Sequence, residues 1–162
     1  MRYAGIITND FSAAPGVCVS FFTQGCPHHC PGCQNPETWS FDGGKEFEGD
    51  TISKICEALV ANGIQRNLCI MGGEPLCPEN QFLTLLVCKN IKEKFPDIKI
   101  YIWTGYTIEE LLKQTTNEKR INQILELTYA IVDGRYIEAE RDITLPMRGS
   151  KNQRVLYKGQ DY

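Results

Sequence analysis

The sequence lacks any apolar run close to the roughly 20 residues that a membrane-spanning helix needs. It also lacks an N-terminal basic stretch followed by an apolar core, so we expect no secretory signal. Without an export route, its eight cysteines indicate a reducing compartment rather than a disulfide framework. We therefore expect a cytoplasmic protein that has no membrane association.

Basic residues are not in excess either. The chain has 17 Lys and Arg residues against 20 Asp and Glu residues, with a net charge of −3. Proteins that bind nucleic acids usually carry a basic footprint, so nucleic acid is not an expected partner. No repeat of fixed period and no low-complexity segment is visible. A chain of 162 residues is expected to form one domain, spanning residues 1–162.

A second cluster of cysteines is missing as well. Three cysteines, Cys26, Cys30 and Cys33, lie within eight residues, and the others are single: Cys18, Cys56, Cys69, Cys77 and Cys88. Structural zinc modules usually pair two separated ligand clusters. One zinc ion bound by the three cysteines and either His28 or His29 still stays open as an alternative. In that case the chain would be a zinc-stabilised binding module.

The spacing of the three cysteines favours an iron–sulfur cluster. Three residues separate Cys26 from Cys30 and two separate Cys30 from Cys33, so one short loop can surround a cuboidal cluster. Thiolates are the usual protein ligands of such clusters, and ferredoxins supply four of them per cluster. Here no fourth cysteine follows at a matching spacing. We therefore expect one iron without a protein ligand, which is free to bind a small molecule.

Strand and helix patterns alternate along the chain. Apolar strand patterns cover residues 17–23, 68–71, 98–103 and 129–132, and helical patterns cover residues 51–62, 80–95, 107–112 and 119–127. Asp50 or Thr51 is the expected cap of the first helix, and Thr107 with Glu110 predicts a capping box. This alternation predicts an α/β fold with a mainly parallel sheet. Because a complete eightfold barrel takes about 250 residues, we expect an open partial (βα) barrel of four to six strands.

Each candidate site follows a predicted strand. These sites are the cysteine loop, Gly72-Gly73-Glu74, Thr104-Gly105 and Asp133-Gly134. The carboxyl ends of parallel strands meet at one edge of a sheet, where ligands bind, so we expect the sites to lie together. Gly72 and Gly73 would let the main chain approach a ligand closely, although a tight turn also explains them. The open flank of an incomplete barrel suits a loop from another protein.

Taken together, the CxxxCxxC loop and the later Gly72-Gly73-Glu74-Pro75 run resemble the radical S-adenosylmethionine superfamily. Within it, four further runs resemble the activating proteins of anaerobic ribonucleoside-triphosphate reductase: GCPHHCPGCQNPETW at 25–39, WTGY at 103–106, VDGR at 132–135 and RGSKNQR at 148–154. The resemblance covers nearly the whole chain. One departure is Cys18, which stands where related activases usually have an arginine.

This resemblance implies an oxidoreductase with a radical mechanism. Cys26, Cys30 and Cys33 would bind a 4Fe-4S cluster, and the residues implied to contact S-adenosylmethionine are Gly32, Cys33, Gln34, Gly72, Gly73 and Glu74. The reduced cluster would cleave S-adenosylmethionine to methionine and a 5′-deoxyadenosyl radical. That radical would take a hydrogen atom from a glycine of the large reductase subunit, leaving a glycyl radical. A low-potential donor such as flavodoxin or ferredoxin would supply the electron.

The resemblance implies no catalytic residue beyond the cluster ligands, because hydrogen abstraction by a radical needs no general base. A radical enzyme that acts on another glycyl-radical protein or on a small molecule is an alternative. We expect His28 and His29 to be exposed loop residues. The aromatic residues Trp39, Trp103 and Tyr106 either stack on adenine or belong to the core. The lone cysteines Cys56, Cys69 and Cys88 are expected to be small buried hydrophobes.

Overall fold

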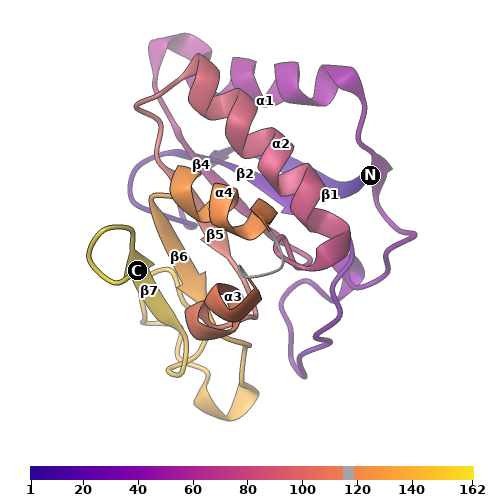
Figure 1. Ribbon diagram of the computed structural model, residues 1–162, viewed down its shortest axis with the longest axis vertical. Helices are drawn as coiled ribbons and strands as arrows, with labels where there is room; N and C mark the ends of the chain where they lie inside the picture. Colours follow the sequence, from indigo (N-terminus) through magenta and orange to yellow (C-terminus); the bar gives the residue numbers. More distant parts are fainter. Residues whose placement is uncertain (115–118) are drawn as a thin grey trace.

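The computed structural model describes residues 1–114 and 119–162 as a layer of helices on a seven-stranded mixed sheet (Figure 1). The strands are β1 (Arg2–Asp10), β2 (Cys18–Thr23), β3 (Lys45–Glu46), β4 (Asn67–Gly72), β5 (Ile100–Trp103), β6 (Ala130–Asp133) and β7 (Arg154–Tyr157). Their order in the sheet is β3-β1-β2-β4-β5-β6-β7. The central strands β2, β4, β5 and β6 are parallel, whereas β1, β3 and β7 pair in antiparallel fashion.

The α/β class and the four predicted strands are confirmed, because these strands form the parallel centre of the sheet. The predicted number of four to six strands is wrong. The three additional strands extend the sheet at its edges. β1 contains Gly5 and the polar pair Thr8-Asn9, β3 has only two residues and β7 has only four. Pairing with neighbours that are distant in sequence defines these strands.

Within the described residues, four α-helices cover the sheet: α1 (Gly49–Val60), α2 (Pro78–Lys94), α3 (Ile108–Gln114) and α4 (Lys119–Leu127). The capping box of α3 is confirmed, since the N–H of Thr107 donates to the Glu110 carboxylate at 2.9 Å and the N–H of Glu110 donates to the Thr107 hydroxyl at 3.2 Å. The expected cap of α1 is wrong: the helix begins earlier, and Glu48 is its N-cap. Across residues 1–114 and 119–162, no helix has both the length and the apolar character that crossing a membrane requires.

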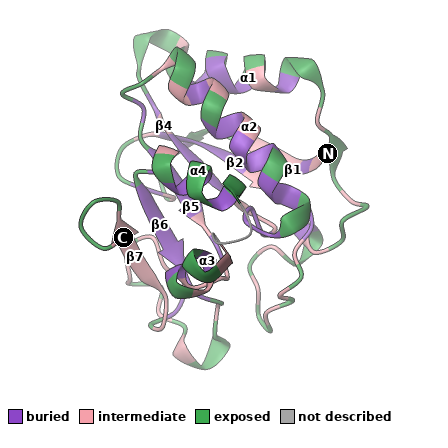
Figure 2. Ribbon diagram, in the orientation of Figure 1, coloured by how far each residue is buried: buried purple, intermediate pink, exposed green. Residues whose placement is uncertain are grey.

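The two faces of the sheet differ because strand residues alternate between them. Adjacent strands place a row of fully buried side chains on the face that the helices cover: Phe21, Ile70, Ile102 and Ile131. Figures 1 and 2 show the four helices over this face, with their buried sides turned to the strands. The following residues of three of these strands, Phe22, Met71 and Trp103, line a cavity on the opposite face. One face therefore forms the main core and the other forms a cavity wall.

The single cysteines that were expected to be buried are buried. Cys56 lies on α1, Cys88 on α2 and Cys69 on β4, and none is more than 4% exposed. Cys18 is fully buried beside Cys69, and its thiol lies 3.7 Å from the carbonyl oxygen of Ala14. In this chain, position 18 therefore contributes to the packing of the core.

Candidate functional site

A cavity of about 520 Å³ lies at the carboxyl ends of the parallel strands and extends over the helix-free face of the sheet. All four predicted turns reach it, which confirms that they lie together. Its wall includes most of the predicted site residues: Cys26, Cys30, Cys33, Gln34, Gly72, Gly73 and Glu74. Gly32 is exposed beside this wall, with a φ of 74° and the Glu138 carboxylate packed against it.

Main-chain hydrogen bonds surround the three cysteine sulfurs. The main-chain donors are His28 and His29 for Cys26, Tyr136 for Cys30 and Asn35 for Cys33, the last at 3.4 Å. N–H donors stabilise a thiolate, and hydrogen bonds to the sulfurs are one means by which proteins tune iron–sulfur clusters. Because Tyr136 follows β6, the donor set comes from two separate parts of the chain.

Burial acts in the opposite direction on two of these thiols. It raises the pKa of Cys26 to about 11, and it also raises the pKa of Cys30. A metal centre deprotonates a thiol that coordinates it, so these sulfurs are suited to a bound cation rather than to free thiolate chemistry. The donor set, consisting of three thiols and their N–H donors, thus fits an iron–sulfur cluster.

The zinc alternative requires ligands that converge on one ion. With a Zn–S distance of about 2.3 Å, the sulfurs around a tetrahedral zinc lie within about 4 Å of one another. Within the described residues, no three His, Cys, Asp or Glu side chains form such a group.

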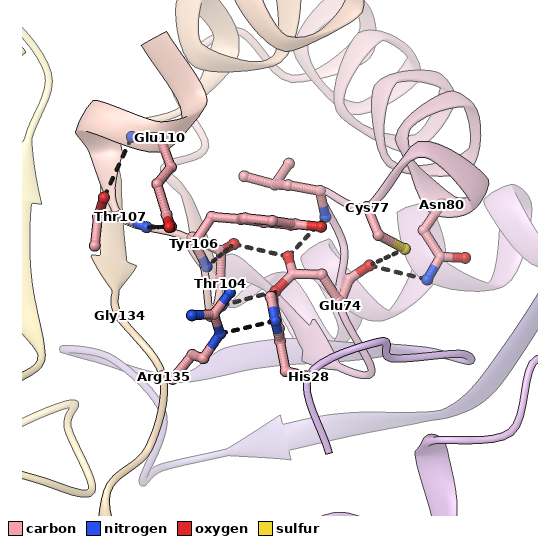
Figure 3. A network of polar contacts seen from close by, with 12 residues as sticks. His28, Glu74, Cys77, Asn80, Thr104, Tyr106, Thr107, Glu110, Gly134 and Arg135 are labelled. Atoms are coloured by element: carbon pink, nitrogen blue, oxygen red, sulfur yellow. Dashed lines mark hydrogen bonds and ion pairs between the residues drawn. The ribbon is translucent and has the colours of Figure 1, made fainter. Parts of the chain in front are cut away.

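Glu74 occupies the centre of the polar network shown in Figure 3. Its Oε1 accepts hydrogen bonds from the Thr104 hydroxyl at 2.7 Å and from the N–H of Leu76 at 2.9 Å. Its Oε2 accepts the N–H of Gly105 at 2.7 Å and lies 2.9 Å from Nε2 of His28. Glu74 is only 1% exposed, so protein donors satisfy both carboxylate oxygens. The side chain joins the ends of β4 and β5 to the cysteine loop.

The two glycines before Glu74 permit a close approach between main-chain segments. A Cβ on Gly73 would clash with the carbonyl group of Gly25, and Gly72 has a φ of 99°. The N–H of Gly73 donates to the carbonyl oxygen of Thr23 at 2.9 Å. Contact between the turn after β4 and the start of the cysteine loop therefore accounts for both glycines, and their contact with a cofactor stays a prediction.

The expectation that both histidines are exposed is wrong for His28. Its side chain is 5% exposed, since it lies against Gly105 and reaches Glu74. His29 is exposed, as expected, and its ring stacks on Trp39 with 4.8 Å between the ring centroids. The sequence could not show this difference, because it depends on residues that follow another strand.

The three aromatic candidates divide between the cavity and the core. Trp39 and Trp103 line the cavity, and Nε1 of Trp103 donates to the carbonyl oxygen of Met147 at 2.8 Å. Nε1 of Trp39 is buried without a hydrogen-bond partner in the part of the chain that the structure describes. Tyr106 packs against the main core and against His28, at 4.6 Å between ring centroids.

Sequence reasoning missed the residues that close the cavity from the C-terminal side. Arg148, Gly149 and Gln153 line it, and so does Arg135 after β6. Three of these four residues belong to the RGSKNQR run, which was the sequence motif that could have indicated them as site residues. The run is uniformly polar, so no pattern of periodicity could have assigned it to a cavity wall.

Asp133, which belongs to one of the predicted turns, and the single cysteine Cys77 both have structural contacts. Asp133 is 1% exposed, accepts the N–H of Ile108 at 2.8 Å and binds the guanidinium of Arg154 through both oxygens. The thiol of Cys77 donates to the carbonyl oxygen of Glu74 at 3.1 Å, and burial raises its pKa to about 12. Neither side chain is free to act on a ligand.

Comparisons with known proteins agree with the cysteine loop. Residues 13–156 match the family model described as a 4Fe-4S single cluster domain. The chain is 34% identical to the anaerobic ribonucleoside-triphosphate reductase-activating protein of Pasteurella multocida, over 100% of both chains. It is 35% identical to the proteins of the same name from Salmonella typhimurium, covering 96% of this chain and 97% of that one, and from Enterobacteria phage T4, covering 96% and 93%. The chain therefore belongs to the family of anaerobic ribonucleoside-triphosphate reductase-activating proteins.

Proposed function

We propose that this protein activates an anaerobic ribonucleoside-triphosphate reductase by generating a glycyl radical on its large subunit. The observation that carries the proposal is the three-cysteine loop that opens into a cavity of about 520 Å³ in a chain of this family. When bound, a reduced 4Fe-4S cluster would supply the electron that cleaves S-adenosylmethionine to methionine and a 5′-deoxyadenosyl radical, which takes the glycine hydrogen. We infer that all 162 residues act as one radical S-adenosylmethionine domain with an incomplete barrel.

The residues of this chain would position the reactants. Cys26, Cys30 and Cys33 are the proposed cluster ligands, and the N–H groups around their sulfurs would stabilise the bound thiolates. The turn at Gly72 and Gly73 exposes main chain at the cavity wall, where it would bind the methionine part of the cofactor. Gly32, Gln34 and Glu74 are the remaining proposed cofactor residues. Because protein donors satisfy both oxygens of Glu74, its proposed role is to orient the groups around the cofactor.

The helix-free face of the sheet supports a protein substrate. The cavity lies on this face, and among the described residues the α-helices cover the other one. An open flank of this kind would admit the glycine-bearing segment of the reductase. We also propose a low-potential donor such as flavodoxin or ferredoxin, because the reaction consumes one electron per cleavage.

The direct test uses anaerobically reconstituted protein, S-adenosylmethionine, a reductant and the reductase large subunit. We expect 5′-deoxyadenosine and a glycyl radical signal by electron paramagnetic resonance. Formation of 5′-deoxyadenosine without that signal would exclude the reductase as the substrate and favour another glycyl-radical protein or a small molecule. A protein that binds stoichiometric zinc, and neither iron nor sulfide, would be a binding module instead.

A further inference from the structure

In the sequence, His28 lies between the proposed ligands Cys26 and Cys30. Its ring contacts residues that follow two different strands (Figure 3). Its Nε2 is 2.9 Å from Oε2 of Glu74, which follows β4. Its Nδ1 is 3.1 Å from Nε of Arg135, which follows β6. The cysteine loop is thus connected through one imidazole ring to the ends of two parallel strands that are not neighbours in the sheet.

The partners of the ring define its tautomer. An arginine Nε always carries a proton and can only donate, so Nδ1 of His28 accepts this hydrogen bond. The proton of the neutral ring must then lie on Nε2, which donates to the Glu74 carboxylate. This contact is therefore a hydrogen bond from a neutral ring to a carboxylate, and the ring has one orientation that satisfies both partners.

Packing restricts the ring further. The edge of the ring faces Tyr106, with an interplanar angle of 72°. On the other side lies Gly105, where a Cβ would clash with Cδ2 and Nε2 of His28. Gly105 has no unusual backbone angle, so the space it leaves for His28 is the reason that this position needs glycine. The side chains of His28 and Glu74 are 5% and 1% exposed, so protein atoms surround most of both groups.

We propose that His28 is a positioning residue, which fixes the cysteine loop relative to the strand ends that form the cofactor site. This inference rests on the proposed function and deepens it. His28 would act through Glu74 and Arg135 on the distance between the bound cluster and the cofactor. It would not itself ligate the metal.

Two conservative variants separate the two contacts of the ring. His28→Gln places an amide N–H near the position of Nε2 and retains the hydrogen bond to Glu74. His28→Asn places a carbonyl oxygen near the position of Nδ1 and retains the acceptor for Arg135. His28→Leu removes both contacts. Gly105→Ala displaces the ring without changing it. His29→Asn is the matched control, because it changes only an exposed side chain, keeps the main-chain N–H that faces Cys26, and asparagine tolerates the φ of 47°.

The first measurement needs no cofactor. Nitrogen NMR of the two histidines in the cluster-free protein should show His28 protonated at Nε2 and unprotonated at Nδ1, and His28→Asn identifies its signals by their loss. A ring protonated at Nδ1, or an equal mixture of tautomers, would overturn the inference.

The second measurement uses the reconstituted protein. We expect iron content per chain to match the wild type in all variants, while kcat/KM for S-adenosylmethionine cleavage falls about 10- to 100-fold in His28→Leu, the range typical of outer partners of metal ligands. Gly105→Ala should resemble His28→Leu. Because the Glu74 contact is the more deeply buried, His28→Gln should lose less activity than His28→Asn. The concentration of S-adenosylmethionine needed to alter the electron paramagnetic resonance signal of the reduced cluster should rise as activity falls, from His28→Gln to His28→Asn to His28→Leu.

Three outcomes would contradict these expectations in different ways. If the wild type cleaves the cofactor and the His28 variants match His29→Asn, the inference alone is wrong. If the His28 variants lose iron in proportion to activity, His28 serves cluster assembly and not positioning, which also overturns the inference. If the wild type binds iron but never cleaves S-adenosylmethionine, the proposed function fails and takes the positioning role with it.

Discussion

The carbonyl oxygen of Gly25 lies 2.8 Å from the main-chain nitrogen of Glu74, so the residue before the first cysteine is hydrogen-bonded to the turn after β4. Asn80 of α2 strengthens this junction, because its side-chain nitrogen donates to the carbonyl oxygens of both residues, at 3.1 and 2.9 Å. The cysteine loop and the glycine turn therefore form one unit. The geometry between a bound cluster and the cofactor would be built into the main chain.

Gly73→Ala should disrupt this unit. The new Cβ would clash with the Gly25 carbonyl group, which is main chain and cannot rotate away. Overpacking of this kind costs about 1–3 kcal/mol in the free energy of unfolding. Urea denaturation of the cluster-free protein measures it. Gly49→Ala is the matched control, since a Cβ there meets nothing within 4 Å, and equal stability of both variants would contradict the predicted clash.

Asn80→Leu should destabilise the protein by removing a donor shared by two buried carbonyl groups. An unsatisfied buried acceptor costs about 1–3 kcal/mol, and the main-chain N–H of Glu74 would still satisfy Gly25 in part. Asn90→Ala, on the same helix, removes a half-buried hydrogen bond to Leu86 and should cost no more than about 1 kcal/mol. Chemical denaturation compares the two variants. A larger loss for Asn90→Ala would show that the Asn80 junction contributes little.

Cys30→Ala should abolish 5′-deoxyadenosine formation while the far-ultraviolet circular dichroism of the protein remains unchanged. Cys30 is a proposed cluster ligand at the cavity wall, and no core side chain depends on it. Cys88→Ala is the control, because Cys88 is fully buried on α2. It should retain the iron content of the wild type. Product formation in Cys30→Ala would show that the ligand assignment is wrong.

The ion pair between Glu109 and Arg154 predicts a specific dependence on pH. Arg154 donates to both oxygens of Glu109, at 3.0 and 2.8 Å, and these hydrogen bonds lower the pKa of Glu109 to about 2 from its usual 4.5. A carboxyl whose pKa is lowered in the folded state stabilises it above the unfolded pKa, and this contribution is lost as pH falls from about 4.5 to about 2.

Thermal unfolding of the wild type and of Glu109→Gln, followed from pH 6 to pH 2, measures this contribution. The melting temperatures should differ near neutral pH and converge at the acid end, because only the wild type loses the ion pair. The effect should be small, since the pair lies at the surface and Arg154 keeps its contacts with Asp133. Curves that stay parallel over the whole range would refute the linkage.

The sequence predicted the centre of the fold well, because local patterns determine it. The apolar runs before Gly72 and Gly105 are strands whose central residues are buried, and a strand in the middle of a parallel sheet needs little else to be recognised. β1 escaped prediction, since Gly5, Thr8 and Asn9 interrupt its apolar pattern and its pairing with β2 includes register shifts. The edge strand β7 was missed because it is only four residues long and follows a long polar run.

The candidate site was predictable only in part. The cysteine spacing identified the proposed ligands because they are close in sequence. The environment of His28 depends on Glu74, Gly105 and Arg135, which come from three later turns. A single sequence does not reveal such distant contacts, so the histidine resembled a loop residue until its neighbours were known.

The alternation along β4 has a consequence for folding. Ile70 lies in the main core, while Met71, the next residue, lines the cavity. A shift of this strand by one position against β2 would exchange these two side chains, exposing an isoleucine in the binding chamber and displacing the glycine turn. An error in the register of β4 would thus lower the stability of the fold and abolish its activity together. Cellular proteases that degrade unstable chains would then also remove the inactive ones.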